Sequence, residues 1–315
     1  MNAENGGMAA RPPAGSAGKA AVIGLGSMGF GMACSLLRAG FDVTGFDISA
    51  DALRRFVEQG GRTAPTPAEA AEGARVVVSV VVNAQQTDAT LFGPAGCAQA
   101  MQPGTVFVGC ATMAPEVVRG LASRLESQGV HYLDAPMSGG VARAAEGKLT
   151  MLASGSAAAF DAARPALSAM TATLYELGEA PGQGAAFKMV NQLLAGVHIA
   201  AACEAMAFAA KQGLDLPRVY EVITQSAGNS WMFENRMPHV LEGDYSPKSA
   251  VSIFTKDLGI VLDMARGANF PVPIAGSALQ IFLMTASAGM AGDDDSSVAR
   301  LYAKLAGLSL PGDMA

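Results

Sequence analysis

Charged and aromatic residues are scarce in this sequence of 315 residues. Only 15% of the residues are Asp, Glu, Lys or Arg, 6% are aromatic, and three are histidines. The formal net charge of −6 comes without any cluster of Lys or Arg. The sequence thus lacks the basic stripe that neutralises nucleic-acid phosphates, and we expect no nucleic-acid partner.

Cysteine is equally scarce. The four cysteines are far apart in the sequence, at Cys34, Cys97, Cys110 and Cys203. They form no C-x-x-C pair, and no histidine stands at metal-ligand spacing, so the pattern indicates neither a disulfide framework nor a zinc site. We expect four reduced, mostly buried thiols and no bound metal.

Long apolar segments are few. The residues through about Lys19 are rich in Gly, Ala and Pro, and they lack the apolar core of a secretory signal. We therefore expect a flexible leader and a cytoplasmic protein. Leu193 to Ala210 is long enough for a membrane span, but it contains His198 and Glu204 and is built on Ala. A buried bundle helix explains this segment better, and we expect no membrane association.

Half of the residues are hydrophobic and 37 are glycines. This composition favours close packing of helices on a sheet, and the length favours two domains. Up to about residue 177, short β-rich runs alternate with helical segments, as a parallel sheet with crossover helices requires. The β-rich runs are Ala20–Gly24, Asp42–Phe46, Arg75–Val82, Thr105–Gly109, Val130–Asp134 and Leu149–Ala153. The fold predicted for this half is α/β, a Rossmann-type doubly wound sheet.

The second half reads as all-α. Its predicted helices are a long one from Ala185 to about Gln212, ended by Gly213, and shorter ones at Leu216–Ser226, Ser249–Arg266, Pro273–Ala288 and Ser296–Leu305. We expect a leader at 1–19, a dinucleotide-binding domain at 20–181 and a helical substrate and dimerisation domain at 182–315. A chain this apolar is expected to hide further surface in a homodimer or homotetramer.

A glycine-rich turn follows the first predicted strand and opens a helix. It matches G-x-G-x-x-G and consists of Gly24, Leu25, Gly26, Ser27, Met28 and Gly29. Gly24 would allow the tight turn, Gly26 the approach of a pyrophosphate, and Gly29 the close packing of helix on strand. The helix N-terminus adds amide donors for an anion.

Asp47 ends the second predicted strand, where an acid can bind the hydroxyls of an adenosine ribose. Such an acid repels a 2′-phosphate, and Ser49 and Ala50 offer no arginine to receive one. Without the glycine turn Asp47 would be interpreted as a capping acid; with it, the pattern predicts NAD as the cofactor.

Four ordered blocks resemble the β-hydroxyacid dehydrogenases, the family of 3-hydroxyisobutyrate dehydrogenase and tartronate semialdehyde reductase. The blocks are Gly24–Gly29, Asp134–Gly140 with Gly147–Thr150, Gly184–Asn191 and Lys256–Gly259. The resemblance extends from about Ala20 to Leu305. It implies a Rossmann domain joined by a long helix to an all-α domain, and a hydride transfer between NAD and a small hydroxy acid.

Lys188 is the candidate acid/base. It lies in an apolar helical run, where desolvation lowers the pKa of a lysine. Asn191 and Gln192, three and four residues on, share its helix face and can orient it or the substrate. From the residues alone, a snorkelling lysine is at least as plausible. The resemblance implies the catalytic role for Lys188 and Asn191, with Gln192 facing the substrate.

The resemblance implies further site residues. Ser138, Gly139 and Gly140 would hold the substrate carboxylate, although an ordinary glycine turn would explain them equally. Lys256 would face the cofactor and substrate, where the residues alone suggest a solvated lysine. The remaining cofactor-lining positions implied by the resemblance are Val81, Val82 and Thr112.

Two departures from the family pattern suggest a subgroup. Many relatives have a second Asn in place of Gln192, and a Leu-Pro in place of Val81-Val82. The run from Ala227 to Met237 is similar to the branch that contains L-threonate dehydrogenase, and we expect Asn229, Ser230, Asn235 and Arg236 to supply polar partners for substrate hydroxyls.

The predicted function is therefore NAD-dependent oxidation of the 2-hydroxyl of a four-carbon sugar acid, L-threonate. The alternatives are 3-hydroxyisobutyrate or tartronate semialdehyde as the substrate, an imine reductase, and a dinucleotide-binding interaction module without catalysis. Lys188 speaks against the imine reductase, which usually has another residue there. The presence of Lys188 and the absence of a basic tail disfavour the interaction module, since non-catalytic relatives commonly lose this lysine and gain such a tail.

Overall fold

The computed structural model describes residues 16–312 and divides into two compact units. The first unit ends at Ala186 and the second begins at Phe187. Most of the expected leader, residues 1–15, lies outside the described residues, and Lys19 already belongs to the first strand. Each unit has its own hydrophobic core.

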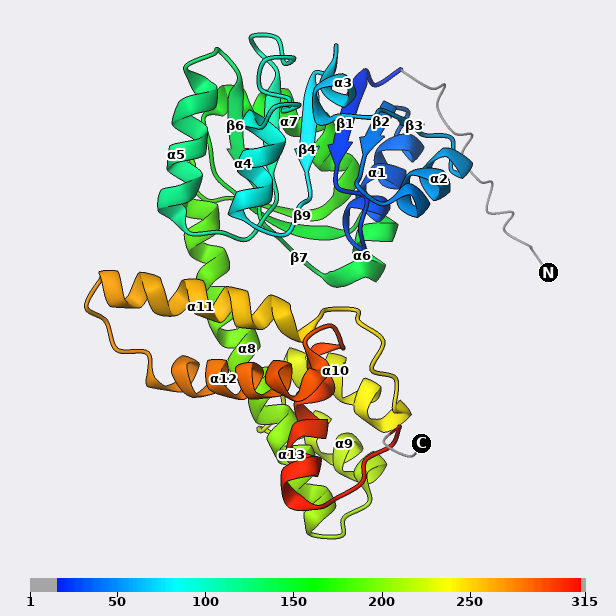
Figure 1. Cartoon of the computed structure of the whole chain (residues 1–315), viewed down its shortest axis with the longest axis vertical. Helices are drawn as coiled ribbons and strands as arrows, with labels where there is room; N and C mark the ends of the chain where they lie inside the picture. The colour runs from blue at the N-terminus through cyan, green and yellow to red at the C-terminus, as the bar shows by residue number, and fades with distance from the viewer. Residues whose placement is uncertain (1–15, 313–315) are drawn as a thin grey trace, which may run out of the picture. The chain divides into compact units, whose positions relative to one another are not determined.

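A six-stranded parallel sheet forms the centre of the first unit (Figure 1). Its strands are β1 (Lys19–Ile23), β2 (Asp42–Phe46), β3 (Arg62–Thr63), β4 (Val76–Ser79), β5 (Val106–Gly109) and β6 (His131–Asp134). Their order is β3-β2-β1-β4-β5-β6, which is the doubly wound order predicted from the sequence. The strand order reverses between β1 and β4, so a ligand crevice is expected outside the carboxyl ends of these two strands.

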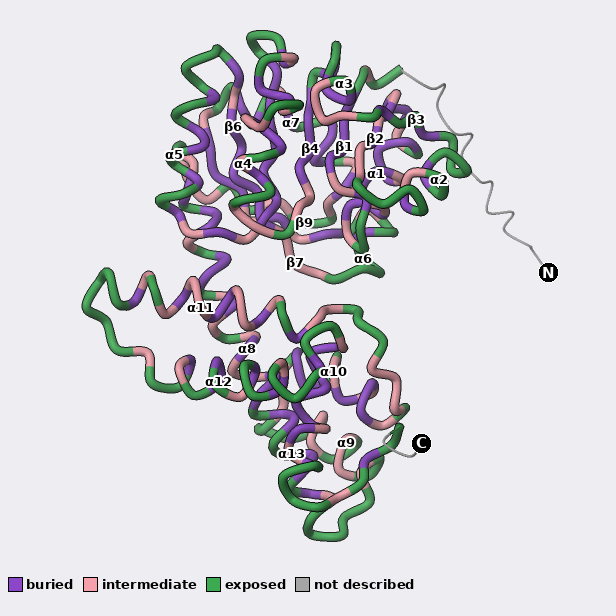
Figure 2. The backbone as a smooth tube through the Cα atoms, in the orientation of Figure 1, coloured by how far each residue is buried: buried purple, intermediate pink, exposed green. Residues whose placement is uncertain are grey.

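Helices cover both faces of this sheet because its central strands are apolar on both sides. In β1, Ala20 and Val22 pack into one core with α1 (Gly29–Arg38) and α7 (Ala157–Met170). Ala21 and Ile23 point the other way, into a second core with α3 (Pro67–Ala71) and α5 (Pro115–Glu126). β4 is buried along its whole length, as its valine run predicts (Figure 2). The peripheral helices are α2 (Ala50–Glu58) and α4 (Ala84–Phe92).

A smaller sheet lies beside the parallel one. It consists of β7 (Met137–Ser138), β8 (Leu149–Ala153) and β9 (Thr171–Glu176), with α6 (Gly140–Glu146) between β7 and β8. The strand expected at Leu149–Ala153 is thus present, but it pairs outside the main sheet. The sequence analysis missed β3, β7 and β9, because two of them have only two residues and β9 is half-exposed, without an apolar run.

The described part of the second unit is helical. Its elements are α8 (Gln183–Lys211, whose first turn belongs to the first unit), α9 (Leu216–Thr224), α10 (Trp231–Glu242), α11 (Val251–Gly267), α12 (Pro273–Thr285) and α13 (Val298–Ala306). The core gathers around the stacked rings of Phe254 and Phe282, 5.1 Å apart. The predicted helix from Pro273 is interrupted after Thr285 by a short π-helical turn, in which Gly289 takes a φ of 89°. α10 was not among the predicted helices.

Two helical stretches, Gln183–Lys211 and Pro273–Met290, have the length and apolar composition of a membrane span. The first holds Lys188 and Gln192 as buried polar side chains and contributes Ile199, Cys203 and Met206 to the core. The helix thus packs one side against the core of the second unit, while less than half of its apolar window is buried. All four cysteines are free, and Cys97, Cys110 and Cys203 are buried.

Buried ion pairs hold the helices of the second unit together. Arg236 of α10 binds Asp295 through two nitrogens, with Nε–Oδ1 at 2.6 Å and Nη2–Oδ2 at 3.1 Å. The neighbouring Asp294 binds Nδ1 of His239 at 2.9 Å and accepts the amides of Lys248 and Ser249. Both carboxylates are completely buried. They tie α10, the 244–250 segment and the start of α13 to one another.

Replacing Arg236 by methionine should destabilise the protein by about 3–5 kcal/mol, because it leaves the Asp295 carboxylate buried without its partner. Burial already raises the pKa of Asp295 to about 6. Without the guanidinium this pKa rises further, and the penalty on the charged form grows as the pH increases. Urea unfolding should therefore show a larger loss at pH 8 than at pH 5.5. Arg218→Met is the control, since its pair with Glu221 is exposed and its loss should cost within about 0.5 kcal/mol.

Candidate active site

The glycine turn between β1 and α1 has room for a ligand on one side only. Gly24 has a φ of +95°, and a Cβ on Gly29 would lie 1.9 Å from the Gly24 carbonyl oxygen, so both positions require glycine. A Cβ on Gly26 would point into open space, which is where a pyrophosphate could approach. No side chain caps the start of α1, a helix that lies wholly within the described residues. Its first amides can therefore serve an anion.

Asp47 follows β2 and lies against this turn. Its Oδ2 accepts the amide of Leu25 at 2.6 Å, and its Oδ1 accepts the amide of Ser49 at 2.8 Å. The carboxylate is thus held at the carboxyl edge of the sheet, in the position where a ribose hydroxyl can be bound. The arginines of α2, Arg54 and Arg55, both pair with Asp51.

Three further predicted positions lie at the carboxyl ends of the neighbouring strands. Val81 and Val82 follow β4, and Val82 is half-exposed, with its amide bound to Oε1 of Gln86 at 2.8 Å. Thr112 follows β5 and is partly buried. The sequence analysis missed Ile48, whose side chain is 94% exposed directly after Asp47. An apolar side chain so exposed beside the acid that is predicted to bind the ribose is a candidate for packing against an adenine ring.

The Ser138-Gly139-Gly140 segment joins β7 to α6. Gly139 and Gly140 both have positive φ values, +131° and +76°. Positive φ values favour glycine, so the backbone itself requires glycine at both positions. Ser138 is partly buried at the end of β7. The role of this segment in binding a carboxylate stays a prediction.

Lys188, Asn191, Gln192 and Lys256 belong to the second unit and are brought together there by α8 and α11. Lys188 is buried. Desolvation lowers its pKa from 10.5 to about 8; the charge of Asp257 opposes this shift and that of Lys256 adds to it. A lysine with this pKa exchanges a proton near neutral pH, which is what a general acid/base requires.

Asp257 is the residue that links this cluster, and the sequence analysis did not identify it. Its Oδ1 binds Nζ of Lys256 at 2.5 Å, and its Oδ2 accepts Nε2 of Gln192 at 2.5 Å. Gln192 in turn accepts Nδ2 of Asn191 at 3.0 Å. Asp257 is 1% exposed and falls on the stripe of α11 that also contains Phe254 and Leu258. The sequence pattern that could have identified it is an acidic residue at a position of the helix where the spacing predicts an apolar side chain.

The expected hydroxyl partners between Asn229 and Arg236 have internal roles in the structure. Arg236 is bound to the buried Asp295, Ser230 caps α10, and Nδ2 of Asn229 binds Oε1 of Glu234 at 2.5 Å. Asn235 binds Arg236. These contacts stabilise the second unit, whereas the buried Oδ1 of Asn229 has no hydrogen-bond partner among the described residues. The substrate role of this segment stays a prediction, as do the roles of Asn191 and Gln192 on the helix that carries Lys188.

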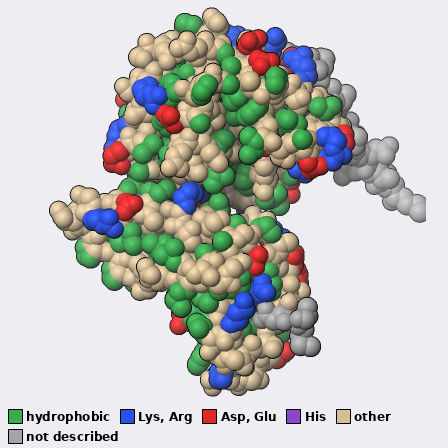
Figure 3. Space-filling model, in the orientation of Figure 1, with side chains coloured by type: hydrophobic (Ala, Val, Ile, Leu, Met, Phe, Trp, Pro, Cys, Tyr) green, Lys and Arg blue, Asp and Glu red, His purple; other side chains and the backbone are tan. Residues whose placement is uncertain are grey.

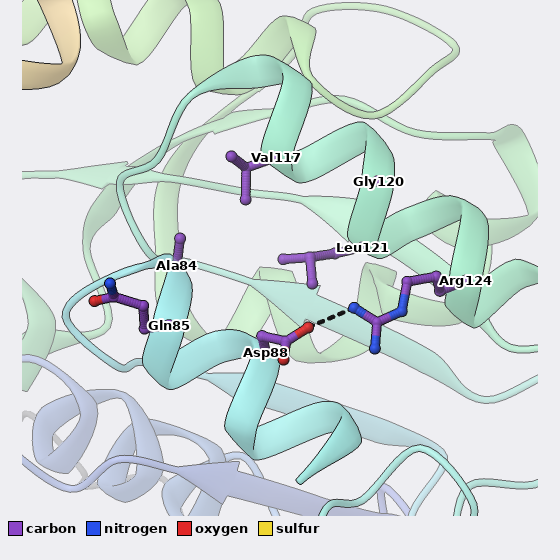
Figure 4. A pocket seen from close by; sticks show the side chains of 7 residues that line it. All are labelled: Ala84, Gln85, Asp88, Val117, Gly120, Leu121 and Arg124. Atoms are coloured by element: carbon purple, nitrogen blue, oxygen red, sulfur yellow. Dashed lines mark hydrogen bonds and ion pairs between the residues drawn. The ribbon is translucent and has the colours of Figure 1, made fainter.

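A surface hollow between α4 and α5 contains none of the predicted site residues (Figure 4). Arg124 closes it by pairing with Asp88 at 2.5 Å and by lying 3.7 Å from the ring centroid of Phe92. The face drawn in Figure 3 carries charges of both signs in small groups. Within residues 16–312 no cluster of His, Cys, Asp and Glu is placed to hold a metal ion.

Comparison with known proteins covers both units. Residues 19–178 match the family described as the NAD binding domain of 6-phosphogluconate dehydrogenase. Residues 182–302 match the family described as NAD-binding of NADP-dependent 3-hydroxyisobutyrate dehydrogenase. The turn, the sheet order and these matches define an NAD-dependent hydroxyacid dehydrogenase. The chain belongs to the β-hydroxyacid dehydrogenase family, the family of 3-hydroxyisobutyrate dehydrogenase.

Named relatives include L-threonate dehydrogenases and 3-hydroxyisobutyrate dehydrogenases. L-threonate dehydrogenase of Cupriavidus necator is 53% identical, over 92% of this chain and 97% of that protein. 3-Hydroxyisobutyrate dehydrogenase of Pseudomonas aeruginosa is 34% identical, over 90% of this chain and 97% of that protein. The crystal structure of a 3-hydroxyisobutyrate dehydrogenase from Salmonella typhimurium has a TM-score of 0.86 and 44% identity, covering 90% of this chain and 99% of that one.

Two substitutions should move the pKa of Lys188 in opposite directions. Asp257→Asn removes a neighbouring negative charge and should lower that pKa by about one unit from its value of about 8. Lys256→Met removes a positive charge and should raise it. The pH titration of the Lys188 ammonium, followed by NMR of labelled lysines, measures both. If the pKa of Lys188 is the same in both variants, the charges of Asp257 and Lys256 do not act on it as stated.

Proposed function

We propose that the enzyme oxidises the 2-hydroxyl of L-threonate to the 2-oxo acid, 2-dehydro-L-erythronate, with NAD as the hydride acceptor. The observation that carries the proposal is the identity to five L-threonate dehydrogenases, 45–53% over 92% of this chain. The proteins named 3-hydroxyisobutyrate dehydrogenase are less similar, at 44% for the Salmonella structure and 34% for the Pseudomonas protein. The buried amide of Gln192 and the partly buried amide of Asn191 add support, because a polyhydroxy acid needs polar partners that an apolar methyl group does not.

Lys188 is the proton acceptor in this proposal. NAD, when bound, accepts a hydride from the substrate carbon. The neutral amine of Lys188 takes the hydroxyl proton, and in the reverse direction its ammonium returns the proton to the carbonyl oxygen. A pKa of about 8 makes both protonation states accessible near neutral pH. Asn191, fixed by Gln192 on the same helix, orients the reacting oxygen.

The remaining residues bind and orient. Ser138, Gly139 and Gly140 hold the substrate carboxylate, and Gln192 lies beside a substrate hydroxyl. Asp47 holds the adenosine ribose and the Gly24–Gly29 turn holds the pyrophosphate. The other cofactor-lining positions are Val81, Val82, Thr112 and Lys256.

We further propose a cytoplasmic homodimer or homotetramer. α8 exposes Phe187, Val190, Leu194 and Phe208, each about half-exposed or more, at spacings that place them along one side of the helix. A helix that is apolar all round is normally covered on all sides. A second copy of the chain would cover this one.

L-Threonate should be oxidised with a kcat/KM at least ~10-fold above that for 3-hydroxyisobutyrate, because the site leaves its own polar groups unpaired when a hydroxyl is missing. The rate of NAD reduction is measured by absorbance for each acid separately, over the same range of concentrations. The two rates give the ratio of kcat/KM. Tartronate semialdehyde is tested in the direction of reduction.

Equal or better turnover of 3-hydroxyisobutyrate would reject L-threonate as the substrate and leave the dehydrogenase assignment intact. Faster reduction of tartronate semialdehyde than of the 2-oxo acid would assign the enzyme to that reaction instead.

Asp47→Ala should narrow the preference for NAD over NADP by about tenfold, because the mutation removes a negative charge that repels the 2′-phosphate. Comparing kcat/KM for the two cofactors measures the change. The control is Asp42→Ala, which removes an acid from the opposite end of the same strand. A wild-type preference for NADP, or an equal effect of the control, would contradict the role of Asp47.

A further inference from the structure

The long helix α8 starts at a residue that cannot cap it. The first helical hydrogen bond runs from the amide of Ala186 to the carbonyl of Gly182, so Gly182 is the N-cap residue and has no side chain to offer. A helix leaves its first four amides without partners inside the helix. In α8 these are the amides of residues 182 to 185, and their acceptors must come from elsewhere.

Two buried side chains of the first unit accept hydrogen bonds from three of these four amides. Oδ2 of Asp134, at the end of β6, accepts the amides of Gly182 at 3.0 Å and Ala185 at 2.8 Å. Oγ of Ser154, just after β8, accepts the amide of Gly184 at 2.9 Å and donates to the same Oδ2 of Asp134 at 3.2 Å. Three of the four amides are therefore bound by two residues, both at most 1% exposed.

Close packing of the backbone also restricts the first turn of α8. A Cβ on Gly184 would lie 2.2 Å from the Leu152 carbonyl oxygen and 3.2 Å from Oδ2 of Asp134. The helix backbone thus lies directly on β8. Asp134 and Ser154 also exchange two backbone hydrogen bonds, at 3.0 and 2.8 Å. These contacts leave the first turn of α8 little freedom to rotate or slide.

Lys188 follows in the next turn of the same helix, four residues and about 6 Å along the axis from Gly184. We infer that Asp134 and Ser154 are positioning residues for Lys188: they set the rotation and height of α8 at its start, and so the place of the amine one turn later. The inference rests on the acid/base role proposed for Lys188.

Electrostatics agrees with this arrangement. Burial raises the pKa of Asp134 to about 6, while its bonds to the amides of Ala185 and Gly182 lower it. The carboxylate is therefore mostly charged at pH 7.5. It faces the positive end of the α8 dipole, where a negative charge is stabilising.

Ser154→Ala tests the inference, with Ser156→Ala as a matched control. Both replacements remove a serine that accepts an amide at a helix start, two residues apart, but Ser156 caps α7, which does not lead to Lys188. We expect Ser154→Ala to lower kcat by about tenfold, since small misplacements of a catalytic group cost 10- to 100-fold. The Kd for NAD should stay within about twofold of wild type. Ser156→Ala should leave kcat within about twofold.

Hydrogen exchange of the peptide covering 182–188 supplies an independent readout. It should accelerate in Ser154→Ala and not in Ser156→Ala. Native kcat in Ser154→Ala, or an equal loss of kcat in both serine variants, would overturn the positioning role. Lys188→Met is assayed alongside with the hydroxy acid that wild type turns over fastest. If Lys188→Met loses turnover while Ser154→Ala keeps its native kcat, the positioning role alone is rejected. If Lys188→Met keeps native turnover, both the acid/base role and the positioning role are overturned.

Discussion

The proposed mechanism depends on a lysine side chain that has been removed from water. Lys188 is buried on α8 between one carboxylate and a second lysine, and desolvation is the largest influence on its pKa. The negative charge of Asp257 raises the pKa of Lys188 and so opposes the effect of desolvation. Its two carboxylate oxygens bind Lys256 and Gln192. A single buried acid thereby contributes to the pKa of the proposed base and binds the amide of Gln192 beside it.

The first unit contributes a fixed backbone turn and a carboxylate held against it. Gly24 and Gly29 bring α1 so close to β1 that no side chain fits between them, and Gly26 leaves open space beside the first amides of that helix. Asp47 is held against the same turn by the amide of Leu25. The parallel sheet makes this possible, since its strand order reverses between β1 and β4, where a ligand crevice is expected at the carboxyl ends of the strands.

The sequence predicted those parts of the fold and site that have strong local patterns. The valine run of β4, the glycine turn and the long apolar helix carrying Lys188 each have a period or spacing that identifies them. The short strands β3 and β7 have only two residues each and owe their pairing to neighbours distant in sequence. The role of Asp257 depends on its approach to Gln192, 65 residues away, and the pairing of Arg236 with Asp295 is equally non-local. Composition and spacing do not reveal such contacts.

The most direct measurement of the central claim is the pH dependence of kcat/KM for oxidation of the hydroxy acid, in wild type and in Lys188→Met. Oxidation requires the neutral amine, so kcat/KM should rise with pH and level off above an apparent pKa near 8, and this limb should be absent from Lys188→Met. A profile that is flat between about pH 6 and 10 in wild type, or a limb that persists unchanged in the variant, would show that a group other than Lys188 accepts the proton.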